Sequence, residues 1–212
     1  MALKAVIFDL DGVIVFTDQF HYQAWKKMAD ELGIYFDETI NNRLRGVSRM
    51  DSLEIILERY EGEPLPQEKK DELAAQKNED YRALLATMTS ADVSEEVRDT
   101  LAEIRRRGYK ISLGSSSKNA KFILERVELL DAFDAVSDGN NIKKSKPDPE
   151  VFLKGAEFLG EKPEDCLVVE DAEAGIMAGI AGGMKTAAIG DAVSCKKADY
   201  ILETFSDLLK IL

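Results

Sequence analysis

The chain has 212 residues, of which 45% are hydrophobic and 32% are charged, a composition typical of a globular protein with a sizeable core. Its formal net charge of −12 at pH 7 argues against nucleic acid as a partner. A small anionic substrate is compatible with that charge, because a local cluster of lysine, arginine and backbone N–H groups can override the overall field.

The sequence shows no sign of a membrane or redox function. The N-terminal apolar run at 5–8 is too short for a signal-peptide core, and no later stretch approaches the roughly 18 uncharged apolar residues of a spanning helix. The two cysteines, Cys166 and Cys195, match no metal-binding or redox spacing. We therefore expect a cytoplasmic protein without membrane partners, acting as a monomer.

Short apolar runs alternate with helical patterns along most of the chain. The runs cover residues 4–8, 110–114, 132–136 and 165–169, with a weaker run at 185–189 and an added edge at 200–201. The segments between them carry apolar residues at helical spacing. This alternation, with strands that are apolar almost throughout, predicts a Rossmann-like α/β core with a parallel sheet covered on both faces.

One stretch interrupts the alternation. Between residues 17 and 89 we find no strand pattern, only amphipathic helical patterns at 18–32, 38–44, 49–60 and 67–85. The simplest interpretation is an all-helical domain inserted after the first strand. We therefore expect an α/β core made of 1–16 and 90–212, and a helical insert made of 17–89.

Polar side chains gather where the predicted strands end. The first strand ends in Asp9 and Asp11, the second runs into a Ser-Ser-Ser-Lys-Asn segment at 115–119, and the fourth ends in Glu170 and Asp171. The loop after the third strand carries Lys146. Because ligands bind outside the carboxyl ends of the strands in open α/β sheets, we expect these residues to share one site.

The acids match the needs of phosphoryl transfer. Asp9 and Asp11 are two residues apart on an extended strand end, so their side chains point to the same side. One carboxylate can attack phosphorus while its neighbour handles the proton of the incoming or leaving oxygen. The acid pair Glu170-Asp171 can complete an all-oxygen magnesium site.

The remaining residues of this edge suit a phosphate. Ser115, with backbone N–H groups of a loop that opens a helix, can hold phosphate oxygens. Lys146 would neutralise the negative charge that gathers there. Each feature alone has an ordinary explanation as a helix N-cap, a turn or a solvated lysine. Together these explanations require four coincidences at strand ends, so we favour a catalytic site.

The motifs resemble those of a known superfamily. Asp-Leu-Asp-Gly-Val at 9–13, Ser115, Lys146-Pro147 and Glu170-Asp171 are similar to the four motifs of the haloacid dehalogenase superfamily. The resemblance spans the whole chain and implies a haloacid dehalogenase-like core with the helical insert as its cap domain. Most members are phosphatases, so the motifs do not choose the reaction.

Finer matches resemble the β-phosphoglucomutases of this superfamily. They lie on the cap and in the second motif, at Thr17, His21, Trp25, Arg45, Gly46, Val47, Ser48, Arg49, Lys77, Ser115, Ser116, Ser117, Lys118 and Asn119. Asp51, Ser52, Leu53 and Asn78 also match, without an assigned contact. The resemblance implies interconversion of β-D-glucose 1-phosphate and glucose 6-phosphate through an aspartyl-phosphate enzyme and β-glucose 1,6-bisphosphate. These cap and loop residues would then bind the sugar phosphate.

The resemblance also assigns roles at the sheet edge. Asp9 would be the nucleophile and Asp11 the general acid/base. Magnesium would be held by the Asp9 carboxylate, the Asp11 backbone carbonyl and Asp171, with Glu170 in support. The transferring phosphate would be bound by Ser115, Lys146, Lys118 and Asn119.

The cap residues make physical sense for a mutase, because a bisphosphate must be held at both ends. Arg49, with its planar donor fork, suits the non-transferring phosphate, and the Ser48 hydroxyl could join it. An ordinary alternative for Arg49 is a solvated helix-start charge that pairs with Asp51 or Glu54.

Two further cap residues could act at the sugar. Lys77 and His21 could contact it or position Asp11. The ordinary alternative for His21 is a partly buried helix residue.

The sequence departs from the family pattern at several places, one of which is the missing Pro-Gly after Asp92-Val93, where the core resumes. Phe16 stands where an acid is common, which places the local hydrogen bonds of that loop in question, and Arg45 replaces a lysine. These changes leave open a different sugar phosphate. They also leave a magnesium-dependent sugar-phosphate phosphatase, in which water attacks the aspartyl-phosphate, as the alternative reaction.

Overall fold

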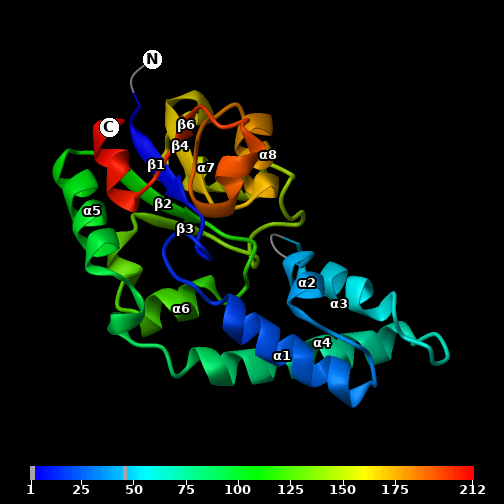
Figure 1. Ribbon diagram of the computed structural model, residues 1–212. Helices are drawn as coiled ribbons and strands as arrows, with labels where there is room; N and C mark the ends of the chain where they lie inside the picture. The colour runs from blue at the N-terminus through cyan, green and yellow to red at the C-terminus, as the bar shows by residue number, and fades with distance from the viewer. Residues whose placement is uncertain (1–2, 45–46) are drawn as a thin grey trace. The chain divides into compact units, whose positions relative to one another are not determined.

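The computed structural model describes residues 3–44 and 47–212. The chain divides into two compact units, one formed by Met1–Phe16 with Met88–Leu212 and the other by Thr17–Thr87. We call the first unit the core and the second unit the cap. The cap is thus an insertion into the core, which the chain leaves after its first strand and re-enters at Met88 (Figure 1).

The described part of the core holds one six-stranded sheet in which all strands are parallel. Its order is β3-β2-β1-β4-β5-β6, so the first strand lies in the middle of the sheet. The strands are β1 (Ala5–Phe8), β2 (Lys110–Gly114), β3 (Ala135–Ser137), β4 (Cys166–Glu170), β5 (Lys185–Ala188) and β6 (Tyr200–Ile201). The strand order reverses direction at β1, which is the position where open α/β sheets bind ligands.

Helices cover both faces of this sheet, because successive strand residues point to opposite sides. Ile7 packs in one cluster with Phe152 and Ala178, which belong to helices on the first face. Phe8 points the other way and stacks on Phe205 at 5.5 Å between ring centroids. The core helices are α5 (Glu95–Arg106), α6 (Ala120–Arg126), α7 (Glu150–Leu159) and α8 (Glu173–Ala181).

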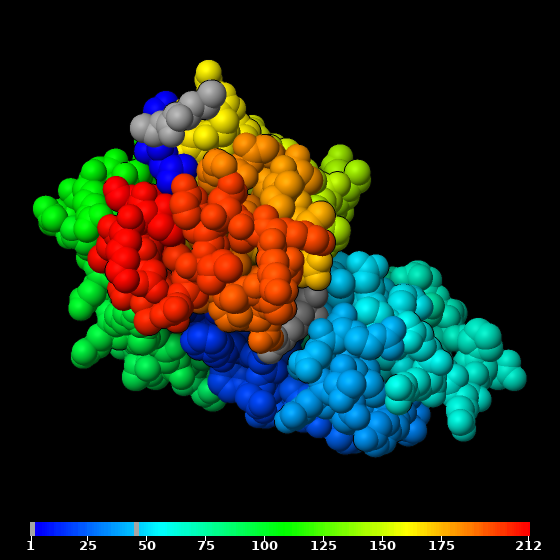
Figure 2. Space-filling view, turned by 45° about the horizontal axis from the view of Figure 1, so that its top comes forward, coloured from blue at the N-terminus to red at the C-terminus, as the bar shows by residue number. Residues whose placement is uncertain are grey.

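The C-terminal residues form part of the core's second face. The turn Phe205–Lys210 packs against α5, and the Tyr109 hydroxyl donates to the backbone carbonyl of Leu212 at 2.7 Å. Figure 2 shows this red C-terminal segment on the surface of the core. The end of the chain therefore helps to close the core over β1.

The described part of the cap is built of helices alone. They are α1 (Asp18–Glu31), α2 (Glu38–Asn42), α3 (Arg49–Leu57) and α4 (Gln67–Leu85). Asp37 and Ser48 accept hydrogen bonds from Ile40 N and Asp51 N and so cap α2 and α3. Apolar side chains such as Trp25 and Leu53 form the cap's own core.

The predicted fold class is confirmed, a parallel α/β core with helices on both faces and a helical insert. The boundaries differ in detail. The third strand begins at Ala135 and not at 132, because Leu130–Ala132 forms a 3₁₀ turn. Helix α3 ends at Leu57, before the turn that precedes Gly62.

We predict that Phe205→Ala lowers the free energy of unfolding by about 3–5 kcal/mol, because a buried aromatic side chain is lost from the face of β1. Phe205 is 4% exposed, whereas Ile201 on the edge strand is 56% exposed. Ile201→Ala is therefore the matched control, with an expected change within about 0.5 kcal/mol. Chemical denaturation of both variants measures the difference, and equal losses would contradict this role of Phe205.

Candidate active site

The first acid of the predicted site lies at the centre of the sheet edge. Asp9 follows β1 directly, and its backbone N–H donates to the carbonyl of Val169 at 3.0 Å, which extends the pairing of β1 with β4 by one residue. The carboxylate is thereby held by backbone geometry between the ends of β2 and β4. Asp9 is buried, with 7% of its surface exposed.

Lys146 joins Asp9 to Glu170. Its ammonium lies 2.5 Å from Asp9 Oδ1 and 2.6 Å from Glu170 Oε1. It also lies over the ring of Phe152, 4.7 Å from the centroid, which adds a cation–π contact. All three charged side chains are buried. The structure therefore brings together Asp9, Lys146 and Glu170, which are far apart in the sequence.

The charges of this cluster support one another. Burial by itself would lower the pKa of the Lys146 ammonium, but the negative charges of Asp9 and Glu170 outweigh burial and hold that pKa above its usual value. Burial raises the pKa of the Glu170 carboxyl, and Lys146 opposes that rise. Lys146 is therefore a cation at neutral pH, placed against the predicted nucleophile.

Asp171 completes an acidic group beside this pair. One carboxylate oxygen from each of Asp9, Glu170 and Asp171 lies within 4.8 Å of the others. Glu170 has both its oxygens engaged, one by Lys146 and the other by the backbone N–H of Ala172 at 2.8 Å. Asp9 and Asp171 are therefore better placed than Glu170 to offer oxygen to a metal, and Glu170 holds its neighbours in position.

A magnesium ion fits this donor set. Magnesium prefers oxygen ligands and is commonly bound in proteins by one or two carboxylates together with water and phosphate oxygens. Asp9 and Asp171 supply carboxylates at the sheet edge. The predicted use of the Asp11 backbone carbonyl stays a prediction.

The loop that carries Asp11 turns tightly against Asp171. Gly12 N donates to Val15 O at 2.7 Å, and Gly12 has a φ of +84°, a conformation that side chains rarely adopt. A Cβ atom at Gly12 would lie 2.1 Å from Oδ2 of Asp171. Asp11 itself is half-buried. Gly12 thus allows the loop to pass over the acidic group.

Phe16, which stands where an acid is common in the family, follows this loop. Its side chain is 78% exposed and fills no space in the core.

The segment after β2 forms a compact loop of serines. Ser117 N donates to Ser115 Oγ, and Asn119 N donates to Ser117 Oγ, each at 3.2 Å. In the described part of the chain, Ser116 Oγ is the one buried side-chain polar atom without a hydrogen-bond partner. Lys118 is exposed and Asn119 is buried. The loop therefore holds an unsatisfied hydroxyl where a phosphate site is predicted.

A second polar cluster lies within the cap. Lys77, on α4, is 3% exposed, and its ammonium lies 3.0 Å from His21 Nδ1 on α1. The ammonium also lies 4.5 Å from the ring centroids of Trp25 and Tyr81. Burial, with the positive charges of Lys77 and Arg49, holds the pKa of His21 well below 6.5. His21 is therefore neutral at physiological pH.

Arg49 lies at the start of α3, and a neutral side chain holds it. Its guanidinium donates to Asn78 Oδ1 at 2.7 Å. The acids considered as its partners are engaged by others, since Asp51 accepts from Ser48 at 2.6 Å and Glu54 accepts from Lys70 at 2.7 Å. The hydrogen bond to Asn78 orients the guanidinium without neutralising its charge.

The other predicted cap residues have separate positions. Thr17, the residue before α1, accepts a hydrogen bond from the Tyr81 hydroxyl at 3.1 Å, and Trp25 is buried in the cap core. Val47 is half-buried beside the capping residue Ser48. Arg45 and Gly46 lie outside the described residues. Substrate contacts by these residues stay predictions.

Three residues of these clusters were missing from the predicted site. Phe152, which lies under Lys146, and Tyr81 in the cap are expected only as helix residues. Asn78 matches the family pattern beside Lys77 but has no role in the predicted site. A signal for Tyr81 existed in its spacing, because Lys77 and Tyr81 are four residues apart on one helix, as are His21 and Trp25 on another. No local pattern could have paired Phe152 with Lys146.

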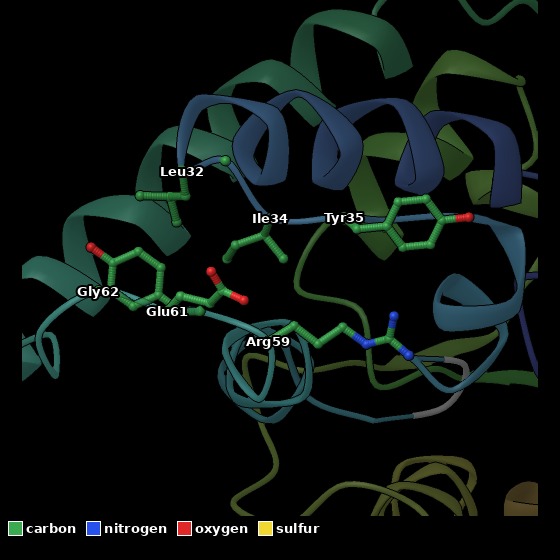
Figure 3. Close-up of a pocket in the computed structure, with 8 residues that line it drawn as sticks. Leu32, Ile34, Tyr35, Arg59, Glu61 and Gly62 are labelled. Carbon is green, nitrogen blue, oxygen red and sulfur yellow. The ribbon is translucent and has the colours of Figure 1, made fainter.

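A pocket on the cap is separate from these clusters. Residues 32–35 and 59–62 line it, and Figure 3 shows Tyr35 and Arg59 among its side chains. It includes none of the predicted site residues. Within residues 3–44 and 47–212, no helix is long and apolar enough to cross a membrane.

We predict that Gly12→Ala raises the magnesium concentration needed for half-maximal activity by about tenfold or more, because its Cβ would displace Asp171. Gly108→Ala is the matched control, since Gly108 has a φ of +88° and no neighbour within 4 Å of an added Cβ. Both variants carry the backbone cost of about 1–2 kcal/mol, but only the first disturbs the acids. Magnesium titrations that coincide for the two variants would contradict this role.

The chain is similar in sequence and in structure to proteins of known family. A family model for haloacid dehalogenase-like hydrolases matches residues 3–183. β-Phosphoglucomutase of Bacillus subtilis is 42% identical over 97% of this chain and 92% of its own length. The crystal structure of β-phosphoglucomutase from Clostridium difficile is 37% identical, with a TM-score of 0.91 over 97% of this chain and 93% of that one.

A phosphatase is also among the relatives. The phosphorylated carbohydrates phosphatase of Thermotoga maritima is 29% identical over 86% of this chain and 83% of its own length. The chain belongs to the haloacid dehalogenase-like hydrolase family, and along almost its whole length it is similar to β-phosphoglucomutase.

Proposed function

We propose that this chain is a β-phosphoglucomutase, which interconverts β-D-glucose 1-phosphate and glucose 6-phosphate through an aspartyl-phosphate and β-glucose 1,6-bisphosphate. Similarity to β-phosphoglucomutases along nearly the whole chain supports this function. The observation that carries it is a second cationic cluster on the cap, built on Lys77 and Arg49, in addition to the nucleophile cluster of the core. A bisphosphate has two phosphates to be held, whereas a plain phosphatase needs only one such site.

The chemistry is carried by Asp9 and Asp11. The phosphorylated enzyme passes its phosphoryl group from Asp9 to the 6-hydroxyl of β-glucose 1-phosphate, which gives its proton to Asp11. After the bisphosphate has turned around, an oxygen of Asp9 bonds to the other phosphorus and the bond to the sugar 1-oxygen breaks. Asp11 returns the proton to that oxygen, and glucose 6-phosphate is released.

Lys146 and the serine loop hold the group in transfer. The Lys146 ammonium touches Asp9, so it neutralises charge where the carboxylate and the phosphate must approach each other. Ser115 and the unsatisfied Ser116 hydroxyl supply donors for phosphate oxygens, with Ser117, Lys118 and Asn119 beside them. A buried hydroxyl without a partner costs about 1–3 kcal/mol, which is recovered when a ligand satisfies it.

Magnesium would be held by Asp9 and Asp171, together with the Asp11 carbonyl, and supported by Glu170. When bound, it supplies positive charge that stabilises the phosphate oxygens. Glu170 keeps Lys146 next to Asp9, which fixes the distance between the cation and the nucleophile.

The cap cluster is the proposed second anion site. Arg49 presents a guanidinium oriented by Asn78, and Lys77 presents an ammonium oriented by aromatic rings. Neutral His21 can hydrogen-bond the sugar or its phosphate without adding charge. The alternative function, a magnesium-dependent sugar-phosphate phosphatase, uses the same core chemistry with water as the acceptor.

The test of the function is the product formed from β-glucose 1-phosphate with magnesium and a trace of the bisphosphate. We expect glucose 6-phosphate, with free phosphate released at a much lower rate. Asp9→Asn should remove turnover by at least about a thousandfold, because an amide cannot take the phosphoryl group. Rapid release of free phosphate without glucose 6-phosphate would favour the phosphatase instead, and full activity of Asp9→Asn would contradict the covalent mechanism.

We predict that Arg49→Ala lowers kcat/KM for the mutase reaction by about 10- to 100-fold, because a charged hydrogen bond to the distal phosphate contributes about 1.5–3 kcal/mol. Hydrolysis of a small phosphate without a second anionic group should fall far less. Arg43→Ala is the control, since Arg43 is exposed and paired with Glu58. Equal losses on both substrates would mean that Arg49 does not bind the distal phosphate.

A further inference from the structure

The aromatic surroundings of Lys77 suggest how the cap site is organised. Lys77 and Tyr81 lie one helical turn apart on α4, and His21 and Trp25 lie one turn apart on α1, which packs against α4. The Lys77 ammonium lies over the rings of both Trp25 and Tyr81, 4.5 Å from the centroid of each. Ring faces attract a cation, and such contacts are strongest when water is excluded.

Contacts at both ends fix the Tyr81 ring. Its face stacks on the His21 imidazole, with 4.0 Å between centroids and 28° between planes. Its hydroxyl donates to Thr17 Oγ1 at 3.1 Å. Tyr81 is only 1% exposed, so its ring has little freedom to move. One side chain thus contacts Thr17, His21 and Lys77.

The contact between Lys77 and His21 determines where the imidazole proton lies. An ammonium has three donors and no acceptor, so at 3.0 Å from Lys77 Nζ the His21 Nδ1 must accept. A neutral imidazole then carries its proton on Nε2, which becomes a donor directed away from Lys77.

We propose that Tyr81 is a positioning residue that, together with Trp25, holds Lys77 against His21 and so fixes His21 as a neutral donor through Nε2–H toward the oxygens of the sugar phosphate. The direction of this hydrogen bond rests on the proposed function, whereas the tautomer does not. Donation matches the chemistry of the ligand, because phosphate oxygens accept hydrogen bonds and offer no donor when ionised.

The charges around His21 agree with this assignment. Lys77 faces the imidazole from α4 and Arg49 acts on it from α3, and both cations disfavour a third positive charge. Burial acts in the same direction and is the largest cause of the lowered pKa. Protonation would also require Nδ1 to become a donor, which would break its contact with Lys77.

The tautomer can be measured directly, because His21 is the single histidine of the chain. Two-dimensional ¹H–¹⁵N spectra of the imidazole, recorded on the full chain without substrate, need no resonance assignment. We expect the Nε2–H pattern, unchanged from pH 8 down to below 6.5. An Nδ1–H pattern, or titration near 6.5, would overturn the proposal whatever reaction the protein catalyses.

Variants separate the ring of Tyr81 from its hydroxyl. Tyr81→Phe keeps the ring, so the tautomer should persist. Tyr81→Leu removes the ring face, so both tautomers should appear and the kcat/KM of the mutase should fall by about tenfold, as expected for a misoriented hydrogen bond. A folded Tyr81→Leu with the wild-type spectrum and wild-type kinetics would overturn the positioning role.

Lys77→Met is a second variant that tests the tautomer of His21 if Tyr81→Leu does not fold. Methionine fills much of the same volume but has no donor, so His21 should lose its fixed tautomer and its pKa should rise toward 6.5, because one of the opposing cations is gone. The pH profile of kcat/KM should then gain an ionisation below neutrality that the wild type lacks. An unchanged spectrum in Lys77→Met would show that Lys77 does not set the tautomer.

Discussion

The buried ammonium of Lys146, held between Asp9 and Glu170, is the interaction on which the rest of the core site depends. Two buried carboxylates side by side would repel each other, and the Lys146 ammonium between them, in contact with both, offsets that repulsion. The sheet order makes this arrangement available, because β1 lies beside β4 and the loop after β3 reaches their carboxyl ends. The acidic group with Asp171 is then a consequence of that fixed geometry.

In the cap cluster the charged groups are positive, and neutral groups contact them. The rings of Trp25 and Tyr81 contact Lys77, and the Asn78 side-chain amide contacts Arg49. A neutral partner orients a cation without consuming its charge, so the cation keeps most of its attraction for an anion. In the core, by contrast, the cation is matched by the carboxylates of Asp9 and Glu170, which contact it directly.

Much of the core site could be predicted because its residues follow strands, and the ends of parallel strands must meet at one edge. The sequence alone places Asp9, Lys146 and Glu170 at this edge, although their roles in catalysis stay predictions. The contacts made by Phe152, Tyr81 and Asn78 do not follow from strand ends, because each depends on how two helices or a helix and a loop pack. The predicted start of β3 was wrong for a related reason. The run 132–136 is apolar except for Asp134, and its first residue belongs to the 3₁₀ turn Leu130–Ala132, so the strand begins only at Ala135.

The hydrogen bond between Tyr81 and Thr17 has a consequence for how proteins with an inserted cap can diversify. Thr17 stands at the entrance to the cap and Tyr81 lies in its last helix, so the segment is closed upon itself by a contact among its own residues. Substitutions elsewhere in a segment closed in this way leave β1, and Asp9 directly after it, in place. Substrate choice can then evolve separately from bond-making chemistry, which is consistent with the occurrence of a mutase and a carbohydrate phosphatase among the relatives of one chain.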